Sequence, residues 1–274
     1  MTQPAVTFQV RQLEEYFNTR LFDRTHNKVN LTQAGERVAE YAERIFDLYA
    51  EMENSVRDLT GEISGTLTIG ASTTIAEYML PALMGEFKNR YPEINLRLKV
   101  SNSEGIVSMV EQNAIDLGIV EVPVSNKSLM VEVCHDDQLV VVTPPDHELA
   151  GSGAAVTVDE IVNYPFVSRE EGSGTREVIA QYLLDAQVDL DDMNFCFELG
   201  SPEAIKGAVE AGMGITIMSR SIIGKELKLG TLAAVQLEPP LSRPFSFVRQ
   251  RQKFRVTVLE ELLEFAQAYF EKNG

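Results

Sequence analysis

Two clusters of hydroxyl and amide side chains follow expected strands, where a parallel sheet would bind a ligand. They are Ser72-Thr73-Thr74 and Ser101-Asn102-Ser103, and each precedes an expected helix. Open α/β sheets bind ligands beyond the carboxyl ends of their strands, and the partial positive charge of a helix N-terminus favours an anion. Because Ser, Thr and Asn are also preferred N-caps, either cluster alone is better explained by capping. Two clusters on adjacent strands leave both interpretations open.

A glycine-rich loop with two arginines is the third and most specific candidate. It spans residues 168–176, after an expected strand at 165–169 and before an expected helix at 174–187. Its glycines allow close backbone approach, and guanidinium groups suit oxyanions. The loop lacks the GxxxxGK[ST] spacing of a nucleotide P-loop, so a small anion suits it better than a nucleotide. The candidate contacts are Arg169, Ser173, Gly174, Thr175 and Arg176. The alternative is a glycine turn in which Arg176 pairs with Glu170 or Glu171.

No catalytic or metal-binding arrangement emerges from the sequence. The three histidines and two cysteines (His26, His135, His147, Cys134 and Cys196) show neither metal-ligand spacing nor a CxxC pair. We expect the cysteines to be reduced core residues. The pairs Asp136-Asp137 and Asp191-Asp192 are interpreted as solvated acidic turns. Gly212-Met213-Gly214-Ile215 lies between an expected helix and a strand, which is the reverse of a dinucleotide fingerprint, and is interpreted as a helix C-cap and turn. We therefore expect neither an enzyme nor a bound cofactor or metal.

Charge is distributed unevenly along the chain of 274 residues. The net charge is −17, but the first 37 residues carry five Lys or Arg against four Asp or Glu, a balance of +1, so the rest carries −18. An acidic body with a nearly neutral N-terminal segment fits a modular regulator better than a protein that grips DNA over its whole surface. No run approaches the ~20 apolar residues that cross a bilayer. No secretory leader opens the chain, so we expect a soluble, cytoplasmic protein without a membrane partner.

The N-terminal quarter predicts helices around a short hairpin. Apolar residues at helical spacing predict a helix over 4–17, and a polar hairpin over about 22–31 follows with Asn27 at its turn. A long helix is expected over 32–60, with an apolar repeat every seven residues. That repeat favours a dimer seam over an amphipathic helix lying on its own domain. Its two rows are Val38, Ile45, Met52 and Leu59, and Ala42, Tyr49 and Val56.

The remaining chain predicts an α/β fold with two lobes. Strands at 67–71, 94–100 and 115–120 alternate with helices at 74–90 and 103–113, which implies a parallel sheet covered on both faces. A second group contains strands at 138–143, 165–169, 195–199 and 214–218 with helices at 174–187 and 202–211. Residues 239–244 predict a stiff connector, after which a strand at 245–249 and a helix at 254–271 return to the first group. The result is a periplasmic-binding-protein-like clamp with the ligand between its lobes.

The sequence resembles the LysR-type transcriptional regulators over nearly its whole length. Residues 2–15 (TQPAVTFQVRQLEE) and 20–24 (RLFDR) resemble the recognition helix and wing, and residues 31–35 (LTQAG) resemble the start of the linker helix. Residues 115–120 and 212–215 also match. The sensor half is most similar to the CysL-like, sulfur-metabolism branch in residues 80–81, 91–92, 170–176 and 201–206. That branch implies a small sulfur oxyanion, sulfite- or sulfate-like, as effector.

The resemblance also implies DNA contacts and a homodimer or homotetramer on double-stranded promoter DNA. Carried over by position, the DNA-contacting residues would be Gln3, Pro4, Thr7, Phe8, Gln9, Arg11, Arg24 and Lys28, with His26 in the same wing. Phosphate contacts position a protein without specifying sequence, and Phe8 departs from the polar or basic residue usual there.

The family's first helix and most of its second would precede this segment. In that family the recognition-helix phrase usually starts about thirty residues into the chain. Without those helices, each unburied apolar side chain of the recognition helix forfeits roughly 1.5–3 kcal/mol. We therefore expect a poorly stable or unusually packed N-terminal segment that binds DNA weakly, from a late-called start codon or a truncation.

The expected organisation has four segments. They are a partial winged helix-turn-helix at 1–31, a linker and dimerisation helix at 32–60, effector lobe I at 61–134 plus 245–274, and effector lobe II at 135–244. The predicted function is an effector-responsive transcription factor. The alternatives are a small-anion-binding protein of the same fold with impaired or lost DNA binding, and an enzyme on a similar two-lobed fold, for which the sequence offers no catalytic residues.

Overall fold

A computed structural model describes residues 3–25, 28–58, 64–151, 153–189, 192–251 and 257–273. The chain forms two compact units, Met1–Val56 and Arg57–Gly274, and each is described by itself. Among the described helices, none is long and apolar enough to cross a membrane.

The N-terminal unit contains the predicted helix and hairpin. Helix α1 spans Gln3–Phe17, and strands β1 (Phe22–Thr25) and β2 (Lys28–Leu31) pair antiparallel, with Phe22 opposite Leu31. His26 and Asn27, which the sequence placed in the wing and at its turn, lie outside the described residues. The predicted helix over 4–17 and the predicted hairpin over 22–31 are both confirmed by α1 and the β1–β2 pair.

Hydrogen bonds of two side chains connect the elements of this unit. The carboxylate of Glu14 accepts from the backbone N–H of Leu21 at 2.8 Å, which ties α1 to the hairpin. The hydroxyl of Thr32 accepts from the N–H of Gly35 at 3.0 Å and donates to the carbonyl of Arg20 at 2.7 Å. A side chain on Gly35 would place its Cβ 2.0 Å from the carbonyl oxygen of Leu21. The LTQAG phrase is therefore a helix start packed tightly against the hairpin.

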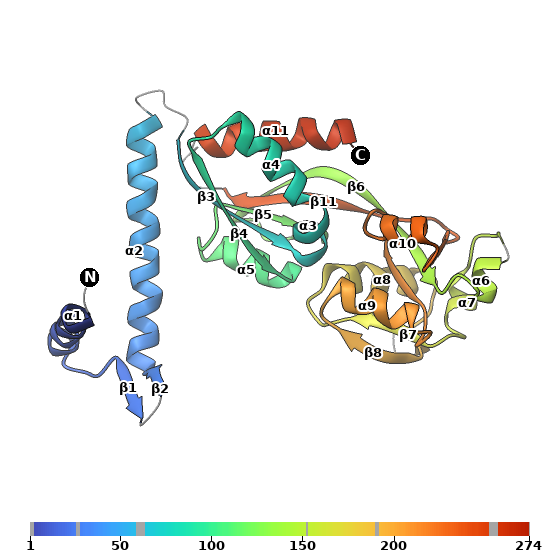
Figure 1. Cartoon of the computed structure of the whole chain (residues 1–274), viewed down its shortest axis with the longest axis horizontal. Coiled ribbons are helices and arrows are strands. Elements are labelled where there is room, and N and C mark those ends of the chain that lie inside the picture. The colour runs from blue at the N-terminus through green and yellow to red at the C-terminus, as the bar shows by residue number, and fades with distance from the viewer. Residues whose placement is uncertain are drawn as a thin grey trace. The chain divides into compact units, whose positions relative to one another are not determined.

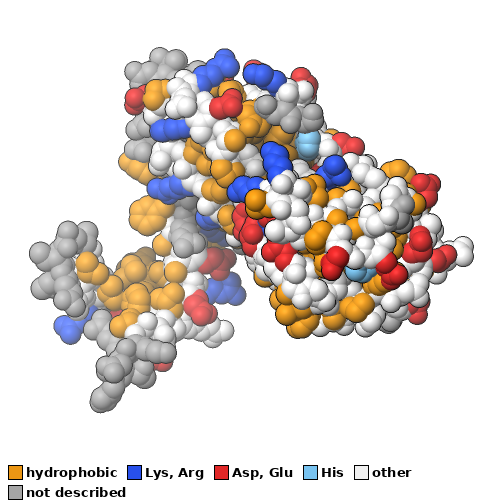
Figure 2. Space-filling model, turned by 45° about the vertical axis from the view of Figure 1, so that its right-hand side comes forward, with side chains coloured by type: hydrophobic (Ala, Val, Ile, Leu, Met, Phe, Trp, Pro, Cys, Tyr) orange, Lys and Arg blue, Asp and Glu red, His pale blue; other side chains and the backbone are white. Residues whose placement is uncertain are grey.

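Helix α2 spans Gln33–Asp58 and exposes much of its apolar repeat. Hydrophobic side chains gather on the visible face of this unit in Figure 2. The seam residues Ile45, Tyr49, Met52 and Val56 are all more than half exposed. Leu59 lies outside the described residues. Sustained exposure of a 3.5-residue apolar period is typical of helices that pack along their length against another copy.

The larger unit is built on a mixed sheet. Strands β3 (Gly65–Ser72), β4 (Ile94–Ser101) and β5 (Leu117–Val120) are parallel, with β3 between the other two. Helices α4 (Leu80–Arg90) and α11 (Thr257–Asn273) cover one face and α5 (Ser103–Glu111) covers the other (Figure 1). The side chains of Leu67 and Ile69 pack on the first face, whereas Gly70 faces Ile106 and Ile115 on the second. The predicted parallel sheet is confirmed.

Two long strands connect the group of elements around β3, β4 and β5 to a second group of elements in the larger unit. Strand β6 (Leu129–Thr143) pairs antiparallel, through Leu129–Leu139, with the whole of β11 (Leu241–Gln250) (Figure 1). The second group has its own apolar cores and contains the remaining elements. They are α6 (Glu148–Gly151), α7 (Val158–Ile161), β7 (Phe166–Arg169), α8 (Gly174–Asp185), β8 (Phe195–Leu199), α9 (Pro202–Glu210), β9 (Thr216–Ser219), a 3-10 turn at Arg220–Ile223, α10 (Gly224–Leu229) and β10 (Ala233–Val235).

Two sequence predictions about these elements are wrong. The segment 239–244, predicted as a stiff connector, is strand from Leu241 onward, where β11 pairs with β6. This part of β11 has β6 on one side and, among the described residues, no strand on the other. Proline is tolerated where its missing N–H has no ladder partner, and Pro244 also lies beside a register shift. The single helix expected over 74–90 is two helices, α3 (Thr73–Tyr78) and α4, because Pro81 starts a new first turn. The predicted lobe boundaries, 134/135 and 244/245, fall within β6 and β11 and stay a prediction.

We predict that charging the exposed row of α2 weakens self-association of the chain. Ile45→Glu combined with Met52→Glu should lower the average mass measured by light scattering at micromolar concentration, since each buried seam residue contributes roughly 1.5–3 kcal/mol. Glu40→Gln, on the same helix but off the row, should leave the mass unchanged. An unaltered mass for the double variant would show that α2 does not form the seam.

Candidate functional site

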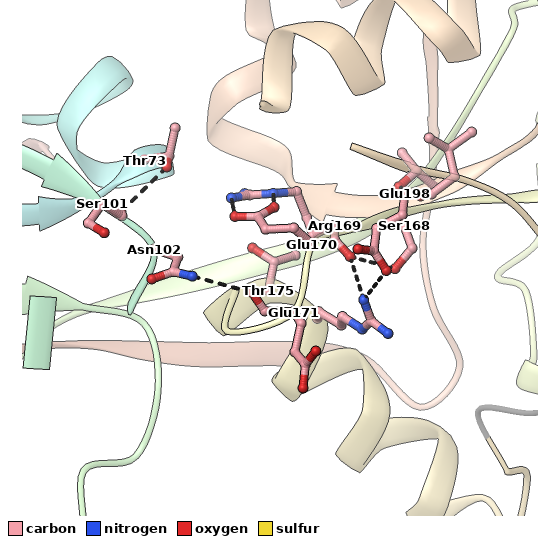
Figure 3. A network of polar contacts seen from close by, with 12 residues as sticks. Thr73, Ser101, Asn102, Ser168, Arg169, Glu170, Glu171, Thr175 and Glu198 are labelled. Carbon is pink, nitrogen blue, oxygen red and sulfur yellow. Dashed lines mark hydrogen bonds and ion pairs between the residues drawn. The ribbon is translucent and has the colours of Figure 1, made fainter. Parts of the chain in front are cut away.

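Three strand-to-helix junctions of the larger unit lie next to one another. The hydroxyl of Thr73 reaches the carbonyl of Ser101 at 3.5 Å, which joins the ends of β3 and β4. The amide of Asn102 donates to the carbonyl of Glu171 at 3.3 Å, and Figure 3 shows Asn102 pointing toward the segment of Glu171 and Thr175. The N–H of Glu104 donates to the carbonyl of Gly172 at 3.4 Å. The three clusters found in the sequence therefore form one neighbourhood.

The glycines of the loop allow this close approach. Gly172 has φ +77, and a Cβ there would lie 2.6 Å from the amide nitrogen of Asn102. A Cβ on Gly174 would lie 2.7 Å from both Cγ of Glu121 and the hydroxyl oxygen of Ser103. The N-terminus of α8 therefore packs directly against the N-terminus of α5 and the residue that follows β5.

A buried arginine that the sequence analysis missed lies at the centre of this neighbourhood. The side chain of Arg243 is 1% exposed, and its Nε donates to Asp137 at 3.0 Å. Its Nη1 donates to the hydroxyl of Thr175 at 2.8 Å and lies 3.6 Å from the carboxylate of Glu121. Arg243 thus contacts residues from β6, α8 and the end of β5.

The two carboxylates around this arginine are also held by hydroxyls. Ser72 donates to Glu121, and Ser219 donates to Asp137 at 2.5 Å. Asp137 is 2% exposed, so the interpretation of Asp136-Asp137 as a solvated turn is wrong for Asp137. Alternation along β6 explains this, because Asp137 faces the interior opposite Arg243 in the ladder. Glu121 could have been found in the sequence, since it follows a predicted strand just as Ser72 and Ser101 do.

Three buried polar atoms at this junction have no hydrogen-bond partner within the described residues. They are the hydroxyls of Ser103 and Ser173 and the Nη2 of Arg243. Ser103 and Ser173 are each 1% exposed and belong to the starts of α5 and α8. Buried polar groups are normally satisfied, so unsatisfied donors at two facing helix N-termini indicate a place for a ligand with acceptor oxygens.

The capping alternative holds for one of the three junctions. Asn102 caps α5, because its side-chain oxygen accepts from the N–H of Gly105 at 2.9 Å. Ser72 and Ser173 occupy the N-cap positions of α3 and α8 without a side-chain capping bond. Thr74, Ser103 and Thr175 are buried, and Ser101 contributes its carbonyl to Thr73.

The two arginines proposed in the loop are occupied by neighbouring acids. Arg169 donates through Nε and Nη2 to both carboxylate oxygens of Glu170, at 2.7 and 2.9 Å, and Figure 3 shows this pair. Burial opposes ionisation of Glu170, but Arg169 outweighs it and holds the pKa of that carboxyl below its usual range. Arg176 pairs with Glu198, and not with Glu170 or Glu171 as the glycine-turn alternative expected. Arg243, by contrast, has one buried guanidinium nitrogen, Nη2, without a hydrogen-bond partner among the described residues.

Acidic side chains surround the junction. Glu177 lies in the first turn of α8, where burial, and then the charges of Glu104 and Glu121, raise the pKa of its carboxyl. Within the described residues no group of three or more His, Cys, Asp or Glu side chains is arranged to hold a metal ion. A guest here therefore meets hydroxyls, helix N-termini and one guanidinium within an acidic surrounding.

A second contact joins α3 to the other group of elements. Tyr78 donates its hydroxyl to Glu203, and Nζ of Lys206 lies 5.0 Å from the centre of the tyrosine ring. Lys206, which is buried, also pairs with Glu203 at 2.7 Å and Glu226 at 2.8 Å. Burial acts to lower the pKa of Lys206, but these acids and the Tyr78 hydroxyl raise it overall. Residues 201–206, singled out in the sequence, thus anchor α3 to α9.

The proposed DNA-contacting residues of the N-terminal unit lie on α1 and the hairpin. Thr7, Phe8, Gln9 and Arg11 belong to α1, and Phe8, Gln9 and Arg11 are exposed. Gln3 and Pro4 begin α1, and Arg24 and Lys28 belong to β1 and β2, with only their backbone described. Contact of these residues with DNA stays a prediction.

Sequence families match both units of the chain. The LysR substrate binding domain family matches residues 60–271, and the bacterial regulatory helix-turn-helix proteins of the lysR family match residues 1–36. The chain belongs to the LysR family. It is therefore a transcriptional regulator with a DNA-binding and an effector-binding part, and not an enzyme.

Individual LysR-family relatives match over most of their length. A RuBisCO operon transcriptional regulator from Allochromatium vinosum is 36% identical, over 95% of this chain and 88% of that protein. The regulatory domain of CcmR from Synechocystis PCC6803, solved in complex with 2-PG, is 31% identical with a TM-score of 0.69, covering 75% of this chain and 97% of that domain. A cysteine-to-serine mutant of OxyR from Corynebacterium glutamicum, solved with H2O2 bound, is 21% identical with a TM-score of 0.73, covering 99% and 85% of the two chains, and shows the same fold.

We predict that Arg243→Ala strongly destabilises the larger unit. Removing one partner of a buried ion pair leaves the carboxylates of Asp137 and Glu121 uncompensated, which costs about 3–5 kcal/mol. Urea unfolding followed by circular dichroism measures the change in the free energy of unfolding. The control, Arg97→Ala at an exposed position of β4, should change it by no more than about 0.5 kcal/mol.

We further predict that Gly174→Ala is unfavourable, because the new Cβ would overlap Glu121 and Ser103. Overpacking of this kind costs typically about 1–3 kcal/mol, measured as a lower midpoint of urea unfolding. Gly207→Ala, in α9 with open space around it, should instead stabilise by about 0.5–1 kcal/mol. Equal effects of the two substitutions would contradict the close approach of α5 and α8.

Proposed function

We propose that this LysR-family regulator senses a small organic anion at the junction of α5 and α8. The observation that carries the proposal is the set of three buried, unpartnered polar atoms, on Ser103, Ser173 and Arg243. Two hydroxyls and a guanidinium are suited to the oxygens of a carboxylate or a phosphate. Ser72, Thr73, Asn102 and Thr175 supply the surrounding polar wall, whereas Arg169 and Arg176 hold the loop through their acids.

The relatives favour a phosphorylated carboxylic acid over a sulfur oxyanion. The CcmR regulatory domain was solved with 2-PG, 2-phosphoglycolate, and the relative from Allochromatium vinosum is named for the RuBisCO operon. Both point toward control of carbon-fixation genes for this chain as well. The sulfur-metabolism branch and its sulfite- or sulfate-like effector find no support among these relatives.

A ligand at this junction would contact both of the groups of elements that β6 and β11 connect. Ser103 belongs to the group built on β3–β5, whereas Ser173 belongs to the group built on β7 and α8. Binding to both would stabilise one arrangement of the two groups over others, which is how differential affinity shifts an equilibrium. We infer that this shift reaches DNA through the oligomer formed by α2.

A second function, anion binding without effective DNA binding, is favoured by one observation. Val6, Leu13 and Phe17 of α1 are each more than 40% exposed in the N-terminal unit. Exposed apolar side chains contribute no burial free energy, so α1 would be held less firmly and would bind DNA more weakly. In that case the effector site would function and the DNA response would be lost.

We expect 2-phosphoglycolate to alter retardation of the chain's own upstream DNA in a mobility-shift assay. Calorimetry should show Ser103→Ala and Ser173→Ala each weakening its binding by roughly 10- to 100-fold, the value of one hydrogen bond to a charged group. Ser242→Ala, exposed on β11, is the matched control and should bind normally. Binding without any DNA response would favour the second function, and binding unaffected by either serine would place the site elsewhere.

A further inference from the structure

The carboxylate of Glu121 lies directly among the unpartnered donors of the proposed effector site. It follows β5, is 1% exposed, and its Cγ lies 2.7 Å from where a Cβ on Gly174 would be. One of its oxygens accepts from Ser72. The other lies 3.6 Å from Arg243, which is longer than the 2.7–3.2 Å of an ordinary N–H···O hydrogen bond.

Charge at the junction is unfavourable for a fully ionised guest. Among the described residues, Arg243 is the single cation paired with the two buried carboxylates of Glu121 and Asp137, which leaves this trio with a charge of −1. Arg169 adds nothing, because Glu170 neutralises it. Glu104 and Glu177 add negative charge from α5 and α8. Anionic oxygens can therefore face the serines and Arg243, but an oxygen facing Glu121 must bring a proton.

We propose that Glu121 determines the specificity of the effector site, selecting an anion that carries a hydrogen-bond donor beside its acidic group. The guests of this class are small hydroxy acids, such as phosphorylated acids with a free hydroxyl. The inference rests on the proposed function and narrows its ligand class: 2-phosphoglycolate, which has no free hydroxyl, should bind at this site but more weakly than a phosphorylated acid of similar size that carries one. Asp137 does not play this part, because Arg243 and Ser219 already occupy its two oxygens.

The test uses two probes that differ by a single hydroxyl. They are 3-phosphoglycerate and its deoxy analogue, 3-phosphooxypropanoate, titrated calorimetrically into the full chain near pH 8, about two units above the second phosphate pKa. The wild-type chain should bind the hydroxyl-bearing probe at least about tenfold more tightly, the lower end of the value of one hydrogen bond to a charged group. Equal affinities for the two probes would overturn the role of Glu121.

Two variants separate the charge of Glu121 from general acidity. Glu121→Gln should bind the deoxy probe at least about fivefold more tightly than wild type, and its preference for the hydroxyl should shrink, because the repelling charge is gone. Glu104→Gln removes a nearby exposed charge and should change both affinities less than about twofold. Circular dichroism confirms folding, and if Glu121→Gln does not fold, the wild-type comparison decides alone.

The outcomes distinguish this inference from the proposed function. Binding of both probes without preference, still weakened by Ser103→Ala, would overturn the role of Glu121 and leave the effector site standing. Binding of neither probe to wild type or Glu121→Gln would overturn both. An unchanged preference in Glu121→Gln would also count against Glu121.

Discussion

The larger unit depends on the contacts of one buried guanidinium, that of Arg243, with two carboxylates and a hydroxyl. It is fully enclosed, and its partners come from β6, α8 and the end of β5. A buried ion cluster of this kind contributes little net stability, because desolvation offsets its attraction, but the loss of one member is costly. Its effect is therefore to specify geometry. The two groups of elements meet where both carboxylates and the hydroxyl of Thr175 can reach one side chain.

The β6–β11 ladder makes this geometry possible. Arg243 and Asp137 are directly opposed in the register, so one antiparallel pair delivers both charges to the same face. The two strands contribute buried side chains to the apolar cores of both groups, and β11 pairs with β5 only after its register shift. This pair of strands thus connects the sheet and helix that carry Ser72, Ser103 and Glu121 to the group that carries Ser173.

Sequence patterns predicted most elements and several residues of the proposed site. Ser72, Asn102, Ser103, Ser173 and Thr175 were predictable, because strand alternation followed by a polar cluster marks the carboxyl edge of a parallel sheet. Arg243 and Asp137 were not, since a proline-flanked arginine and an acidic pair resemble solvated segments. Their burial depends on long-range pairing of β6 with β11, which no local period encodes. The pairing of Arg176 with Glu198 was missed for the same reason, because that partner is set by the tertiary fold, whereas Arg169 pairs with its sequence neighbour Glu170. Contact of either arginine with an effector stays a prediction.

The uncapped serines bear most directly on what the junction is for. A serine at an N-cap normally accepts from the first turn of its helix, and Asn102 does so on α5. The hydroxyl of Ser72 instead donates a hydrogen bond to Glu121, and the hydroxyl of Ser173 has no partner among the described residues although Ser173 is only 1% exposed. Forgoing a cap costs typically about 1 kcal/mol, and burying an unpaired hydroxyl costs more. A fold that needed these serines only for stability would cap with both, so their arrangement is better explained by a guest that completes it.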